Sequence, residues 1–186
     1  MKQGLLFLIF FISSVSLFAY QTKDCAEIKS EQLRLSMLGS NLANINTTKT
    51  PEGGPYRPFV IKSCANGGCE VTRNSSPILK YLPDHPDADE NGYVAYPAVD
   101  LNSDYAVFNM TATKLRLLGD KKICGTNMIV NGSSVLLKYQ PKINSGKEDI
   151  FNFDNNQRVL SWMHIDERGQ TSAINFSSIG AVVSYQ

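Results

Sequence analysis

Residues 33–57 read LRLSMLGSNLANINTTKTPEGGPYR, and this stretch decides how the fold begins. Its first part continues an apolar spacing of three and four residues that runs from Ile28 to Ile45, which is typical of an amphipathic helix. From Thr47 onward it contains prolines and the pair Gly53-Gly54, so it cannot continue that helix. The stretch therefore predicts the end of a helix followed by an extended loop.

A second stretch, from Asp100 to Leu118, has the same apolar spacing. Each predicted helix has about 19 residues and is roughly 28 Å long. Neither helix can bury its apolar stripe alone, so antiparallel packing of the two is the economical arrangement. Only Glu31 interrupts the first stripe. The alternative is that both stripes pack against β structure.

The first 19 residues are typical of a secretory signal peptide. Lys2 precedes an apolar run from Leu5 to Phe18, which is shorter than the roughly 20 residues of a spanning helix, and Ala19 suits cleavage. A retained membrane anchor is the alternative. The formal charge of +1 falls to 0 when Lys2 is lost. A neutral chain without a Lys/Arg run favours neither nucleic acid nor a membrane surface as a partner.

Four cysteines follow this leader, and an even number in a secreted chain indicates disulfides. Cys64 and Cys69 flank Ala-Asn-Gly-Gly, a hairpin-turn signal that brings the two positions together. Antiparallel helices would place Cys25 beside Cys124, and this pair would close a loop of about 100 residues, worth roughly 4–5 kcal/mol in the chain-entropy model. If the stripes pack on β structure instead, these two cysteines do not meet. Cysteines in this number could also serve as free thiols or as metal ligands.

The region between the helices predicts short strands near residues 59–61, 70–72, 78–82 and 93–96. The acidic segment from Asp87 to Gly92 matches the first half of an EF-hand loop, but Ala98 stands where a bidentate glutamate should close the calcium shell. We therefore expect a solvated turn, no metal and no cofactor.

Residues 28–118 resemble the proximal-rod subunit of the bacterial flagellar basal body, the FlgC family, through the opening stretch and through HPDADENGYVAYPAVDL at 85–101. The resemblance implies a self-assembling structural protein of the basal body whose partners are other rod proteins or its own copies. It implies a helical core of Leu35, Leu38, Leu42, Tyr105, Phe108 and Leu115. It places the subunit contacts near Asn41, Asn44, Thr48, Lys49 and Tyr56.

Three features depart from that family: the leader, which indicates the periplasm, the cysteines, and a second helix that ends near Gly119-Asp120. The chain is therefore divided into a signal peptide (1–19), a rod-like domain (20–124) and a β-rich module (125–186). The fold class is α+β: an antiparallel helix pair with a small β/loop region between the helices, then an antiparallel β module.

The C-terminal module contains Trp162 and His164 on one face of a predicted strand. Trp162 belongs either to the core or to a binding surface. Ser161, His164 and Asp166 could be combined into a catalytic set, but the chain has no established catalytic motif, so we expect no enzyme. The alternative function is a periplasmic binding module that reuses the rod domain and recognises a protein or cell-wall ligand through this β module.

Overall fold

The computed structural model describes residues 25–121, 124, 126–138, 147–166 and 168–176, so the predicted leader lies outside the described residues. In chain order the elements are a helix over residues 25–43, β1 (Phe59–Ala65), β2 (Gly68–Arg73), β3 (Ile78–Tyr81), β4 (Tyr93–Tyr96), α2 (Leu101–Asp120), β5 (Asn127–Asn131), β6 (Ser134–Lys138), β7 (Glu148–Phe153), β8 (Val159–Ile165) and β9 (Thr171–Asn175). The fold is α+β, and every strand pair within these residues is antiparallel, which confirms the predicted class. Neither helix, over its described length, is long and apolar enough to cross a membrane.

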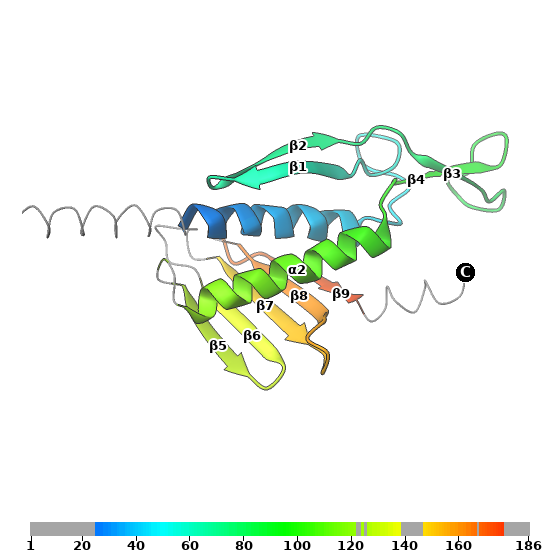
Figure 1. Cartoon of the computed structure of the whole chain (residues 1–186). Helices are drawn as coiled ribbons and strands as arrows, with labels where there is room; N and C mark the ends of the chain where they lie inside the picture. The colour runs from blue at the N-terminus through cyan, green and yellow to red at the C-terminus, as the bar shows by residue number, and fades with distance from the viewer. Residues whose placement is uncertain (1–24, 122–123, 125, 139–146, 167, 177–186) are drawn as a thin grey trace, which may run out of the picture.

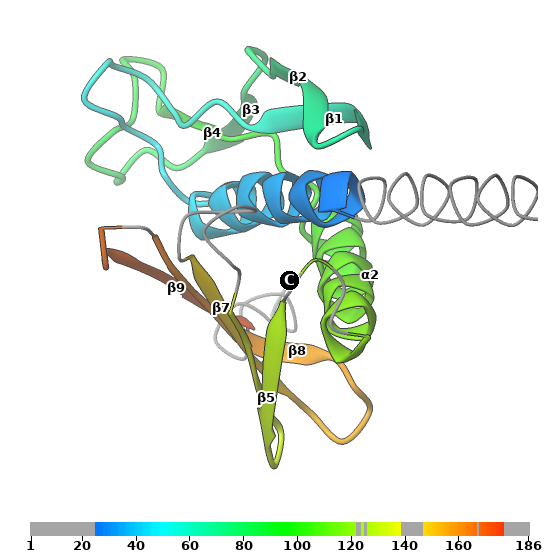
Figure 2. The ribbon, with the colours of Figure 1, turned by 90° about the vertical axis from the view of Figure 1, so that its left-hand side faces the viewer.

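The elements form layers around the first helix (Figure 1). The β1–β2 hairpin lies on one side of that helix, and the sheet formed by β5 to β9, in that order, lies on the other (Figure 2). The β3–β4 pair extends past the end of the first helix as a separate arm (Figure 1). The first helix is therefore covered on two opposite sides.

One cluster of buried apolar side chains joins both helices to the C-terminal sheet. Leu35 and Leu42 of the first helix, Phe108 of α2 and Phe151 of β7 are each no more than 1% exposed. Contacts between the start of the first helix and the end of α2 show that the helices are antiparallel, as predicted. Their stripes also pack against β structure, so the two arrangements that the sequence left open occur together. The buried cluster contains side chains from before and after residue 125.

Local sequence signals account for the ends of several elements. The carboxylate of Asp100 caps α2 by accepting a hydrogen bond from the Ser103 backbone N–H at 3.1 Å. Asn66 and Gly67 both have positive φ, 52° and 80°, which is the pattern of a tight two-residue turn between β1 and β2. The Asn-Gly signal in the sequence therefore sits at the turn for which it is suited.

Gly39 allows the first helix to approach the sheet. The six-membered ring of Trp162, only 4% exposed, occupies the position where a β-carbon on residue 39 would lie. Gly119 plays the same part for α2, because an added β-carbon there would lie 2.6 Å from Leu137 Cδ2. A larger side chain at either position would push a helix away from the core.

We expect Gly39→Ala to lower the free energy of unfolding by about 1 kcal/mol. Alanine in a helix interior normally gains up to about 1 kcal/mol over glycine, but overpacking against Trp162 costs about 1–3 kcal/mol. Urea denaturation of the full chain would measure the difference. In a Trp162→Phe background, which removes the obstructing ring, the same alanine should be neutral or stabilising. A stabilising Gly39→Ala change in the wild-type background would contradict this packing.

Candidate assembly site

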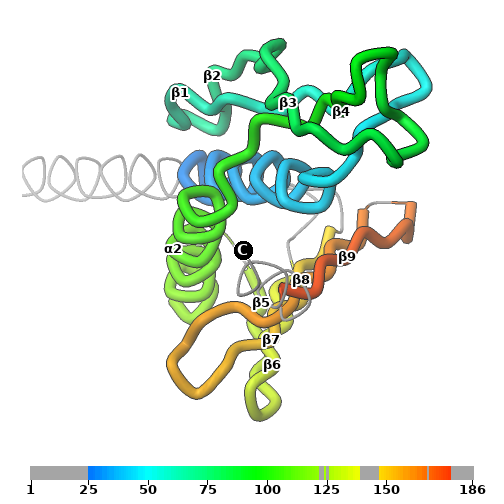
Figure 3. Tube along the Cα trace, turned by 90° about the vertical axis from the view of Figure 1, so that its right-hand side faces the viewer, coloured from blue at the N-terminus to red at the C-terminus, as the bar shows by residue number. Residues whose placement is uncertain are grey.

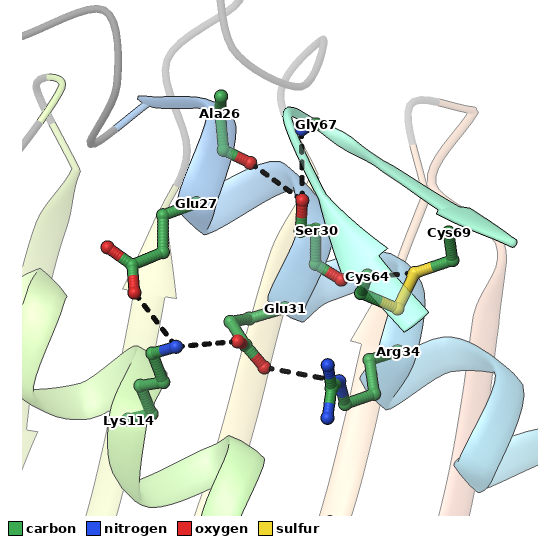
Figure 4. A network of polar contacts seen from close by, with 9 residues as sticks. All are labelled: Ala26, Glu27, Ser30, Glu31, Arg34, Cys64, Gly67, Cys69 and Lys114. Atoms are coloured by element: carbon green, nitrogen blue, oxygen red, sulfur yellow. Dashed lines mark hydrogen bonds and ion pairs between the residues drawn. A yellow bond between two sulfur atoms is a disulfide. The ribbon is translucent and has the colours of Figure 1, made fainter. Parts of the chain in front are cut away.

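The residue that interrupts the apolar stripe, Glu31, lies in an ion cluster between the two helices (Figure 4). Its side chain is 8% exposed, and its Oε1 accepts a hydrogen bond from Lys114 Nζ at 2.7 Å. Its Oε2 lies 3.6 Å from Nε of Arg34, one turn further along. Lys114 Nζ also lies 2.8 Å from Oε1 of Glu27. The cluster therefore bridges the start of the first helix to the second half of α2.

The hydrogen bonds to Glu27 and Glu31 raise the pKa of Lys114 above its ordinary value of 10.5, although partial burial opposes the change. A lysine with a raised pKa in the folded state stabilises the fold fully below its unfolded pKa. That contribution is lost as the pH rises through the folded pKa. The cluster therefore adds stability at neutral pH and loses it only in alkaline solution.

The same end of the helix pair carries the predicted disulfide pairs. In the structure Cys25 is joined to Cys124, 99 residues further along, with the two Cα atoms 5.5 Å apart. Cys64 and Cys69 face each other across the β1–β2 hairpin and are also joined. The hairpin turn is held to the first helix because the Gly67 N–H donates a 2.9 Å hydrogen bond to the hydroxyl of Ser30 (Figure 4). The β1–β2 turn and Cys124 are therefore both joined to the start of the described first helix.

Asn41 makes the corresponding contacts at the other end of the first helix. Its Nδ2 donates to the Phe59 carbonyl at 2.9 Å and to the Asp104 carboxylate at 3.2 Å. Its Oδ1 accepts from the Phe59 N–H at 2.8 Å and from the Tyr56 hydroxyl at 3.3 Å. Burial raises the pKa of Asp104, and the hydrogen bond from Asn41 partly offsets that effect. Asn41 is 2% exposed, so its buried side chain joins the first helix to the start of β1 and to the first turn of α2.

The remaining predicted subunit-contact residues lie around residues 44–56, after the first helix. Asn44 Nδ2 donates to the Ser40 carbonyl at 2.9 Å, and the Tyr56 hydroxyl lies 2.9 Å from the Ser40 hydroxyl. Thr48 Oγ1 donates to the Asp87 carboxylate at 2.7 Å, which joins this segment to the β3–β4 loop (Figure 3). Lys49 is exposed. Of the predicted contact residues, Lys49 is the one whose substitution would disturb the interior least.

Sequence reasoning did not anticipate the exposed apolar surface of the β3–β4 arm. Leu79 is 62% exposed and Tyr81 63% exposed, and every residue of β3 faces solvent. Tyr81 packs edge-on against Tyr93 of β4, with ring centroids 5.4 Å apart. The sequence predicted strands at these positions, but a strand pattern does not reveal whether another layer covers the strand. We define the exposed surface of residues 78–82 and Tyr93 as the arm surface.

Ser161, His164 and Asp166, the residues considered for a catalytic set, each have other hydrogen-bond partners. Ser161 Oγ accepts a hydrogen bond from Asn152 at 2.7 Å, whereas Asp166 caps its own turn and has a pKa lowered chiefly by the Gln170 N–H. His164 is instead paired with Asp149, whose carboxylate also accepts the indole N–H of Trp162, both at 2.9 Å. Trp162 is a core residue. Within the described ranges no three His, Cys, Asp or Glu side chains are grouped to hold a metal ion.

Comparison with known proteins gives relatives of one kind. The flagellar basal-body rod protein FlgC of Borreliella burgdorferi is 32% identical over 102 aligned residues, which cover 40% of this chain and 67% of that protein. The proteins of the same description from Salmonella typhimurium and Escherichia coli O157:H7 are 36% and 35% identical over 85 residues, covering 40% of this chain and 63% of each relative. No family model matches the chain.

The paired helices, bridged by ions at one end and by Asn41 at the other, and the sheet packed against them define an α+β protein built on a helix pair. The chain belongs to the FlgC family of flagellar basal-body rod proteins. The similarity covers less than half of the chain. Both helices contribute to these contacts: Glu31 and Asn41 lie on the first helix, and their partners Lys114 and Asp104 lie on α2.

We expect Lys114→Met to lower the free energy of unfolding by about 1 kcal/mol at neutral pH, because Glu31 keeps its charge in a buried position with only the longer contact to Arg34. Thermal and urea denaturation would measure the loss, which should shrink as the pH rises above the ordinary lysine pKa of about 10.4. Glu27→Gln, which removes the exposed partner of the same lysine, should cost under about 0.5 kcal/mol. Equal losses for Lys114→Met and Glu27→Gln would refute a special role for Glu31.

Proposed function

We propose that this chain is a structural, self-assembling component of the flagellar basal body, built into the rod or attached to it as a periplasmic paralogue. The observation that carries the proposal is the similarity to rod proteins of several bacteria, combined with a helical scaffold that connects both ends of the molecule. Its partners are other basal-body proteins or its own copies, and it needs no cofactor. It is a structural protein and not an enzyme.

The arm surface and the loops beside it supply a surface for such assembly. Exposed apolar and aromatic side chains on the arm, among them Leu79 and Tyr81, are suited to a contact between proteins. The Thr48–Asp87 hydrogen bond and the Asn41 contacts hold the adjoining loops in one conformation. Loops that are ordered before binding lose less conformational entropy when a partner docks.

A periplasmic location is part of the proposal. The leader-like sequence of residues 1–19 and the joined cysteine pairs support export to an oxidising compartment. In the alternative hypothesis of a binding module, Trp162 could have marked the binding surface, but that side chain is only 4% exposed. The C-terminal sheet therefore serves the scaffold, with its inner face covering the helix pair.

We expect Leu79→Asp and, separately, Lys49→Glu to weaken association with basal bodies while leaving the fold intact. Both side chains are exposed, so neither change opens the core, and the few residues that dominate a protein contact each cost more than about 1 kcal/mol when they are lost. Circular dichroism would verify folding, and co-purification with basal bodies and swimming in soft agar would report function.

Lys62→Glu is the matched control, because among the described residues this exposed lysine pairs only with the exposed Glu70 on the β1–β2 hairpin. It should leave both association and swimming unchanged. Folded Leu79→Asp and Lys49→Glu variants that associate and swim like the wild type would count against the proposed function.

A further inference from the structure

A pocket of about 270 Å³ opens between the first half of the N-terminal helix, the β1–β2 turn and strands β7 and β8. Two lysines line it: Lys29 from the helix and Lys147 from the residue preceding β7. Among the described residues neither ammonium group has an ion-pair partner. The pocket therefore presents two positive charges that pair with no carboxylate among the described residues.

One carboxylate, that of Asp149, lines the pocket together with the two lysines. Asp149 is 2% exposed, and its Oδ1 accepts hydrogen bonds from Trp162 Nε1 and His164 Nδ1, both at 2.9 Å. These bonds orient the imidazole of His164 at the pocket wall. Leu33, 40% exposed, adds an apolar patch beside Lys29. The site suits an acidic segment with an apolar neighbour.

The loop between β3 and β4, residues 82–92, has this composition. It contains Asp84, Asp87, Asp89 and Glu90 and has no Lys or Arg. Asp89 Oδ1 accepts from the N–H groups of Asn91 and Tyr93, at 2.9 and 2.8 Å, so the loop is ordered by its own carboxylates. Asp84 and Glu90 remain exposed without an ion-pair partner among the described residues, and Leu82 is 39% exposed.

The acidic loop and the basic pocket lie toward opposite ends of the molecule. The loop is bonded to Thr48, beyond the end of the first helix, whereas Lys29 is in its second turn beside the β1–β2 turn. From Lys29 to the end of the described helix at residue 43 the chain advances 14 residues, or about 21 Å, and the loop lies beyond that end (Figure 1). The loop of one molecule therefore cannot enter its own pocket.

We propose that the acidic loop 82–92 of one copy docks in the Lys29–Lys147 pocket of a second copy. The proposal rests on the proposed self-assembly and deepens it by naming the two surfaces that meet. Because different surfaces of the two copies are joined, the contact is head-to-tail and can repeat to give an open filament, as a rod requires. Opposite charges at the contact favour this pairing over a pocket-to-pocket pairing, which would bring lysines together.

The first test uses zero-length carboxyl-to-amine cross-linking of the purified full chain, with equal amounts of ¹⁴N- and ¹⁵N-labelled protein mixed before reaction. We expect mixed-isotope peptides that join the segment 82–92 to Lys29 or Lys147. Cross-links from this segment that are confined to single molecules or that reach only other lysines would overturn the proposal. A chain that stays monomeric at its highest soluble concentration would do the same.

The second test exchanges the charges. Lys29→Glu and Glu90→Lys should each weaken self-association about tenfold in sedimentation velocity, and a mixture of the two variants should recover it, because the altered loop then meets the altered pocket. Lys62→Glu, a change outside the pocket lining and outside the acidic loop, should have no effect. Failure of the mixture to recover association would overturn the proposal.

These tests separate the inference from the proposed function. If the chain co-purifies with basal bodies but its loop cross-links there to a different protein, the proposed function stands. The second copy is then excluded as the occupant of the pocket. If the chain self-associates and the charge-exchange mixture recovers association, but the chain never co-purifies with basal bodies, the docking contact stands. The proposed function is then excluded.

Discussion

The structure depends on the burial of two helical apolar stripes against a sheet that follows them in sequence. Phe108 of α2 lies at the centre of this contact and is fully buried, with its ring 5.5 Å from that of Trp162 and 5.0 Å from that of Phe176. Two antiparallel helices would leave part of each stripe in water, and the inner face of the C-terminal sheet covers the remainder. The helix pair and the sheet therefore stabilise each other.

Polar contacts at the two ends of the first helix are compatible with only one alignment of the helices. Glu31 meets Lys114 near its start, and Asn41 meets Asp104 near its end. A shift of either helix along the other would leave a buried carboxylate and a buried amide without these partners, at a cost of about 1–3 kcal/mol for each unsatisfied group. The same two contacts fix the position of the first helix relative to α2.

Much of this fold could be predicted from local sequence signals. Apolar spacing located both helices, and the Asn-Gly pair located the β1–β2 turn. The cysteine positions indicated the two pairs that the structure joins. What could not be predicted depends on residues that are distant in sequence. In the sequence Glu31 only interrupts the apolar stripe, because its partner Lys114 is 83 residues away and is brought near it by folding.

The contacts of Asn41 and the exposure of the arm surface also depend on residues that are distant in sequence. Asn41 was predicted at a subunit contact because of its place in a family-like stretch, yet its partners Phe59 and Asp104 become visible only when the chain is folded. The exposure of β3 likewise follows from the absence of a covering layer over the described part of that strand. Alternation of side chains along a strand carries no information about such a layer.

Native-state hydrogen exchange on the full chain most directly tests the shared core of helices and sheet. Buried amides of the first helix, of α2 and of strands β7 and β8 should open with the same free energy, and Phe108→Ala should lower that energy equally in all of them. Strands that keep their protection while the helices lose theirs, with or without the substitution, would contradict a shared core and show that the two parts fold separately.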